Sequence, residues 1–76
     1  MVRFIELTQR VIVTRYVRGF DGRVPEAHVV EEPTTVHVDS IRQVSPRGQY
    51  SKVWFHGIEN PIIVSESYEF VRQMIV

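Results

Sequence analysis

Two stretches decide the fold of this 76-residue chain: VHVDSIRQV at residues 36–44 and IIVSESYEFV at residues 62–71. In the first, apolar and polar residues alternate, which is typical of a strand with one buried face. The second begins as a strand. After Ser67, apolar residues recur four apart, as Phe70 with Met74 and Val71 with Ile75, which indicates a short helix whose apolar stripe covers the sheet. Neither stretch carries a reaction, so the sequence predicts a small β-rich domain more clearly than it predicts a function.

Length and composition limit what this domain can be. We expect one domain, residues 1–76, and a domain of this size hides only about 60% of the surface of its unfolded chain. Because the chain has no cysteine, neither a disulfide nor a thiolate zinc site can support the thin core, and self-association is the expected support. The formal net charge of zero argues against a long-range attraction to nucleic acid.

The sequence predicts neither a membrane span nor a signal peptide. No apolar run approaches the roughly 20 residues that a span needs, and Arg3 and Glu6 interrupt the apolar residues near the start. We therefore expect no membrane partner. The absence of cysteine is compatible with a reducing compartment, so a cytoplasmic location is expected.

Alternation along the rest of the chain predicts a mainly β, antiparallel architecture. Strands are expected at residues 2–8, 35–39, 50–56 and 62–65, followed by a C-terminal helix at residues 68–76 with Ser67 as its N-cap. With the two sides of a hairpin, this makes about six strands. They could form an antiparallel meander or a small SH3-like or Sm-like barrel.

Residues 9–33 are expected to form an inserted hairpin that protrudes from the body and turns at residues 19–22. In that hairpin the numbers of paired residues sum to 41, which places glutamates opposite two arginines: Arg10 faces Glu31 and Arg15 faces Glu26. The same register opposes apolar residues, pairing Val11 with Val30, Ile12 with Val29 and Val17 with Val24. Pro25 has no N–H for a ladder, so its strand should be an edge or carry a bulge.

Three pieces at the two ends of the chain form a frame of limited specificity. A short apolar strand ends in Leu7 and Thr8, an apolar-polar-apolar-x-x-Ile segment spans residues 36–41, and a turn at Gly57 precedes a strand closing in Val-x-Glu-Ser at residues 64–67. This frame, over residues 2–8 and 34–76, resembles the small FlbD/SwrD family of flagellar and swarming-motility proteins, and equally some short phage and prophage proteins. Residues 9–33 depart from the family, which usually has a tight turn there.

The resemblance implies a small β protein that performs no known chemistry and acts through contacts with a partner. A phage-encoded or motility accessory factor that modulates a larger host protein would fit this description. The inserted hairpin is the part of the chain about which the resemblance implies nothing.

Residues that could carry catalysis or bind metal are scattered. The three histidines, His28, His37 and His56, fall on separate strands without the close spacing of a zinc site. No nucleophile elbow occurs either. We therefore expect no metal, no cofactor and no enzymatic activity.

An apolar patch is the first candidate for a binding site. If Val53 points into the core, Trp54 lies on the opposite, outer face of the sheet, where Ile63 is also expected. A patch centred on a tryptophan is typical of protein-binding surfaces. Together with Phe20 and Tyr16 of the hairpin, it is the predicted protein-binding surface, unless the hairpin folds over and buries it.

Basic residues on the hairpin support a second hypothesis, single-stranded nucleic-acid binding by a small β-barrel. We expect Arg10 and Arg15 to be salt-paired with glutamates. Four basic residues then remain available to phosphate: Arg18, Arg23, Arg47 and Lys52. A third hypothesis is a structural homo-oligomer without any other ligand.

Overall fold

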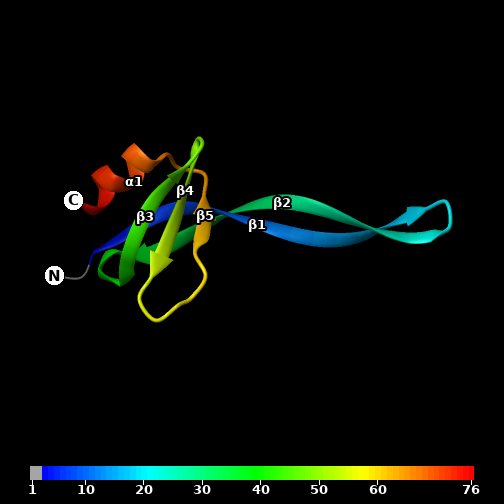
Figure 1. Cartoon of the computed structure of the whole chain (residues 1–76), viewed down its shortest axis with the longest axis horizontal. Coiled ribbons are helices and arrows are strands. Elements are labelled where there is room, and N and C mark those ends of the chain that lie inside the picture. The colour runs from blue at the N-terminus through cyan, green and yellow to red at the C-terminus, as the bar shows by residue number, and fades with distance from the viewer. Residues whose placement is uncertain (1–2) are drawn as a thin grey trace.

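The computed structural model describes residues 3–76, which form one antiparallel sheet and one helix. The strands are β1 (Phe4–Gly19), β2 (Gly22–His37), β3 (Ile41–Arg47), β4 (Tyr50–Phe55) and β5 (Ile62–Val64), and the helix is α1 (Tyr68–Ile75). A 3-10 turn, η1 (Val38–Ser40), joins β2 to β3. The strands lie in the order β2-β1-β5-β4-β3, as the ribbon in Figure 1 shows.

The protein consists of a small body and a long two-stranded arm (Figure 1). β1 and β2 pair along their whole length, from Phe4 with His37 to Gly19 with Gly22, and the numbers of paired residues sum to 41 throughout. The predicted hairpin register is therefore confirmed. The arm, which we define as residues 11–30, extends the molecule to 55 × 24 × 20 Å.

Residues 3–76 form five strands instead of the expected six. The first predicted strand and the near side of the hairpin are one continuous strand, β1, and the far side of the hairpin likewise continues into residues 34–37 as β2. Residues 41–47, for which the sequence predicts no separate strand, form β3. Within residues 3–76, β2 and β3 remain open edges, so the meander is confirmed and the barrel is not formed. Val2, the expected start of the first strand, lies outside the described residues.

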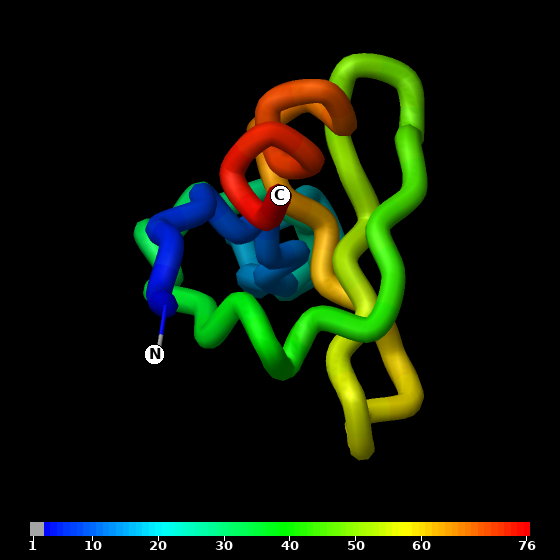
Figure 2. Tube along the Cα trace, turned by 90° about the vertical axis from the view of Figure 1, so that its left-hand side faces the viewer, coloured from blue at the N-terminus to red at the C-terminus, as the bar shows by residue number. Residues whose placement is uncertain are grey.

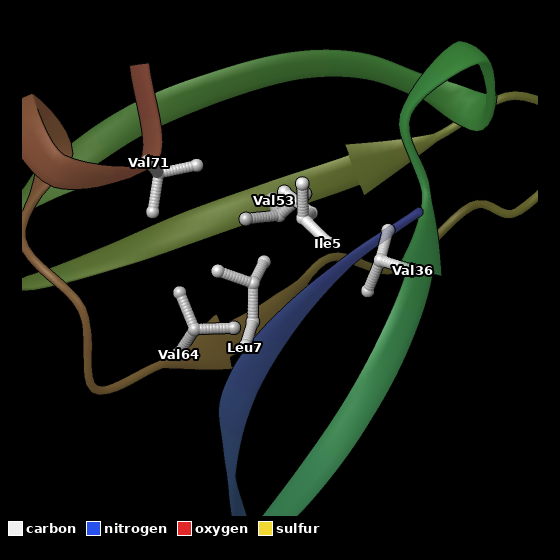
Figure 3. Packing of buried hydrophobic residues seen from close by; sticks show 6 residues of the cluster. All are labelled: Ile5, Leu7, Val36, Val53, Val64 and Val71. Atoms are coloured by element: carbon white, nitrogen blue, oxygen red, sulfur yellow. The ribbon is translucent and has the colours of Figure 1, made fainter. Parts of the chain in front are cut away.

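Within the described part of the chain, six apolar side chains make the core of the body, and they converge from four strands and the helix (Figure 3). They are Ile5, Leu7, Val36, Val53, Val64 and Val71. Burial of Val53 and Val36 agrees with the predicted inward faces. Figure 2, which looks along the arm, shows α1 lying over the body; in Figure 1 the helix is at the end away from the arm. The arm therefore contributes nothing to the core.

Hydrogen bonds pair backbone groups at both ends of α1, and one of them ties the helix to the rest of the body. The Ser67 hydroxyl accepts a hydrogen bond from the Phe70 N–H over 3.2 Å, which confirms Ser67 as the N-cap. At the other end, the Arg3 guanidinium donates to the Met74 carbonyl over 2.7 Å. Both contacts satisfy backbone groups that a helix leaves unpaired at its ends.

Candidate functional site

The outer face of the sheet is the face opposite the core. Residues paired across neighbouring strands share a face, and the register pairs Arg10 with Ile63 and Ile63 with Lys52. Trp54, two residues after Lys52 on β4, lies on this same face. The prediction that Trp54 and Ile63 face away from the buried Val53 therefore agrees with the strand register.

An open pocket of about 380 Å³ lies on the outer face where the arm leaves the body. We call it the arm-base pocket, and its lining residues are Arg10, Ile12, Val29, Arg47, Tyr50 and Ile63. Apolar side chains from the arm and from β5 thus meet around one hollow, which basic and aromatic side chains border.

Arg10 is held in place at this pocket by two contacts. Its Nη1 atom donates to Glu31 Oε1 over 2.8 Å, which forms the predicted salt pair. Its guanidinium carbon lies 4.2 Å from the centre of the Tyr50 ring, a geometry that adds cation–π attraction. The wall of the pocket is therefore ordered before any partner binds.

Two apolar residues at the arm-base pocket are largely exposed to solvent. Ile12 is 73% exposed and its cross-strand neighbour Val29 is 52% exposed. Ile63 and Trp54 are less exposed, since both are half-buried, and Trp54 does not line the pocket. At the arm-base pocket, the exposed apolar surface is therefore formed by Ile12 and Val29 and not by the tryptophan.

The hairpin residues of the predicted protein-binding surface lie elsewhere on the arm. Tyr16 is exposed about midway along the arm, and Phe20 is fully exposed at its tip. Ten residues of extended chain, roughly 33 Å at the usual rise per residue, separate Phe20 from Arg10 and its neighbour Ile63. One protomer therefore does not bring Phe20 together with Trp54 and Ile63.

The four basic residues predicted for nucleic-acid binding form two separate pairs. Arg18 and Arg23 lie directly opposite each other at the arm tip and, with Tyr16 and Gly22, line a hollow of about 620 Å³. Arg47 lines the arm-base pocket instead, and Lys52 lies beside Ile63. The structure thus does not join them into one basic patch.

One expected salt pair is not formed within the described part of the chain. Arg15 and Glu26 are opposite each other as predicted, but no Arg15 nitrogen lies within ion-pair distance of Glu26. Glu26 Oε2 lies instead 3.5 Å from His28 Nε2, two residues along the same strand. The arginines of the outer arm are therefore not neutralised in the way that Arg10 is.

The side chain of His37 makes local contacts in the body. His37 Nδ1 lies 3.2 Å from the Ser40 hydroxyl, and its ring packs 5.2 Å from that of Phe4. Across residues 3–76, no three potential metal ligands are grouped. Over the same residues, no helix has the length and apolar character needed to cross a membrane.

Part of the arm-base pocket could be predicted from the sequence. The predicted register already opposed Ile12 to Val29 on the face that carries Arg10 and Glu31. It did not indicate that β5 would lie beside Arg10, nor that Tyr50 would stack on its guanidinium. Without the positions of β5 and Tyr50, Ile12 and Val29 could not be recognised as one side of a pocket.

Comparison with protein-family models, with curated proteins and with solved structures gives no match. The class of the protein therefore follows from its own geometry: a small antiparallel β domain with a projecting two-stranded arm and an open apolar pocket at the base of that arm.

Proposed function

We propose that this protein is a non-enzymatic protein-interaction module that binds another polypeptide chain at the arm-base pocket. The observation that carries this proposal is the exposure of Ile12 and Val29 beside an open pocket. Solvent-exposed apolar side chains clustered around a hollow are typical of binding surfaces.

The composition of the pocket supports a protein partner. Aromatic and arginine side chains are enriched in the residues that dominate binding energies, and Tyr50 and Arg10 are already stacked here. Because Glu31 and Tyr50 hold Arg10 in place, little side-chain entropy remains to be lost when a partner covers it. An apolar side chain of the partner would fill the pocket between Ile12 and Ile63.

The biological setting is part of the same proposal. The resemblance of residues 2–8 and 34–76 to the FlbD/SwrD family and to short phage proteins supports a role as an accessory factor that modulates a larger host protein. The cysteine-free sequence is compatible with action in the cytoplasm.

The test compares two matched substitutions on one strand, in proteins captured from a lysate of the native host. Ile12→Thr removes apolar surface at the pocket, whereas Val13→Thr makes the same kind of change on the opposite face of the arm. We expect Ile12→Thr to reduce capture by about tenfold, as for the loss of one important interface contact, and Val13→Thr to leave it unchanged. Equal capture by wild type and Ile12→Thr would refute binding at the pocket.

Nucleic-acid binding at the arm tip is the second candidate, and one observation favours it. Arg18 and Arg23 are directly opposed, an arrangement that destabilises a strand pair unless an anion neutralises it, and Tyr16 could stack on a base beside them. A parallel capture experiment with a nuclease-treated lysate separates the two candidate functions. Capture that nuclease and Arg18→Ala abolish, but Ile12→Thr does not, would favour nucleic acid.

A further inference from the structure

On its β1 side, the arm has no neighbouring strand among residues 3–76. β5 pairs with β1 at Gln9 and Arg10, and no other strand within residues 3–76 pairs with β1 beyond that point except β2. From Val11 to Gly19, β1 therefore has an open edge. Such an edge is a template for pairing with another chain.

The hydrogen bonds of Thr8 show which backbone groups point toward this edge. The Thr8 N–H donates to Glu66 Oε1 over 2.7 Å, and the Thr8 carbonyl accepts from the Ser65 N–H over 2.8 Å. Both groups of Thr8 therefore point away from β2. Because this direction alternates along an antiparallel strand and the register is unbroken, four residues of the arm present their N–H and C=O groups at the open edge: Ile12, Thr14, Tyr16 and Arg18.

The two edges of the arm differ in how they are protected. On β2, Pro25 lies opposite Tyr16 and Pro33 lies opposite Thr8, so both prolines fall where an N–H would point outward from the sheet. Proline at such positions prevents edge-to-edge pairing. Residues 11–18 of β1, VIVTRYVR, contain neither proline nor glycine. Their β-branched and aromatic residues favour an added strand.

The arm also needs a neighbour for its own stability. A two-stranded hairpin is at best marginally stable in water, and a third strand or a packed face is normally required. Exposed apolar residues occur on both faces of this arm, and they include Ile12, Val13, Val17, Val24, Val29 and Val30. A strand added along β1 would give the arm the third strand that a stable hairpin normally requires.

The sequence of β1 is complementary to itself in an antiparallel register that pairs residues 13–19 with their copies. When the paired numbers sum to 32, Tyr16 faces its own copy on a two-fold axis, Thr14 faces Arg18, and Arg15 faces Val17. No two charges are opposed, and the pairing stops before β5. Sums of 28 and 30 would instead oppose Arg10 to Arg18, or Arg15 to its own copy, which is unfavourable.

In the same register, the side chain of Phe20 from one protomer lies at the arm-base pocket of the other. This register places Gly19, the last residue of β1, opposite Val13 of the other protomer. Phe20, the first residue of the turn, then lies next to Ile12 of that protomer, at the edge of the outer face that carries the pocket. The most exposed aromatic residue of the chain is thus placed beside its open apolar pocket. The formal net charge of zero leaves no long-range repulsion between two copies.

We infer that a second copy of this chain pairs antiparallel with the open edge of β1, with Tyr16 on the two-fold axis and Phe20 of each protomer at the arm-base pocket of the other. This inference rests on the proposed function and names its partner. The result is a closed dimer with a four-stranded arm, since a two-fold contact uses the same surface on both protomers.

The first test uses two prolines placed opposite each other on the two edges. Thr14 pairs with Ala27, and both N–H groups point outward, so Thr14→Pro and Ala27→Pro place the same strain in the arm. Only Thr14→Pro removes two hydrogen bonds from the dimer, which corresponds to a roughly thirtyfold weaker association in sedimentation velocity. We expect Ala27→Pro to dimerise like wild type. Equal dimerisation by the two variants, or a wild type that stays monomeric at every concentration, would overturn the inference.

The second test does not depend on proline being tolerated. Because the chain has no cysteine, Tyr16→Cys introduces a single thiol whose Cα would lie about 5.5 Å from its copy, within the range for a disulfide. Thr14→Cys is the control, since four residues, roughly 13 Å, would separate it from its copy. We expect Tyr16→Cys to cross-link on mild oxidation and Thr14→Cys not to. Equal cross-linking, or none, would contradict the register.

The two proposals can fail separately. Capture of a foreign protein that Ile12→Thr abolishes, by a protein that remains monomeric, would support the interaction module and overturn the dimer. A dimer sensitive to Thr14→Pro and Phe20→Ala, without specific capture of any other protein, would support the dimer, make the second copy the occupant of the pocket, and refute a larger host protein as the partner.

Discussion

Glu66 joins three parts of the chain through two of its oxygen atoms. Its carboxylate accepts the Thr8 N–H over 2.7 Å, and its backbone carbonyl accepts the buried Ser51 hydroxyl over 2.8 Å. The segment that leads into α1 is thereby tied to β1 and β4. The site where β1 changes from body to arm is held by the same residue.

Replacing Glu66 by alanine should therefore destabilise the body. The partly buried Thr8 N–H would lose its acceptor, at a cost of about 1–3 kcal/mol, and the melting temperature of a domain this small falls by about 4–8 °C per kcal/mol. Thermal unfolding followed by circular dichroism measures this change. Glu66→Gln keeps a carbonyl acceptor and should lose less; equal melting temperatures for the wild type and Glu66→Ala would show that the contact contributes nothing.

At the scale of elements, α1 depends on the sheet that it covers. Eight residues are too few for a helix that is stable alone in water, so packing of Val71 into the core and the cap at Ser67 must hold it. The sequence predicted this helix and its cap from the apolar spacing and a single hydroxyl. The exposure of Phe70 and Met74 was not expected, and it arises because only the stripe of Val71 and Ile75 faces the sheet.

Removal of the cap tests whether helix and sheet unfold together. Ser67→Ala should cost about 1 kcal/mol, the usual value for an N-cap, while Ser67→Asp should retain the stability. Helical circular dichroism and the fluorescence of Trp54, the single tryptophan, should report one shared transition at a lower temperature. A loss of helical signal that precedes the fluorescence change would show that α1 melts independently.

At the scale of the whole molecule, body and arm have different requirements. All six core side chains lie in the body, whereas the arm is held by its own backbone ladder and one ion pair at its base. We therefore expect the body to fold without the arm, and the arm to serve association.

A shortened chain tests this division. The pair Val11/Val30 has the same backbone hydrogen-bonding pattern as the pair Gly19/Gly22, because the two pairs lie an even number of positions apart along β1. An Asn-Gly turn that replaces residues 12–29 can therefore close the hairpin without changing its register. The shortened protein should keep native Trp54 fluorescence and a melting temperature close to that of the wild type, and it should be monomeric in sedimentation. An unfolded product would show that the body needs the arm.

The sequence alone determined the strand register of the arm and the cap of the helix. Both depend on residues close along the chain or joined by one turn, where alternation and charge admit a single alignment: Arg10 opposite Glu31, and Ile12 opposite Val29. It also placed Ile63 on the outer face, because side chains alternate along a strand.

Only the tertiary structure decided where the candidate site lies. The pocket exists because β5 lies beside Arg10 and because Tyr50, forty residues further along the chain, stacks on its guanidinium. Likewise, the direction of the open edge became clear only from the contacts of Thr8 with Ser65 and Glu66. Such contacts join strands that are distant in sequence, and their alignment depends on packing of the shared core, which the local pattern of residues does not specify.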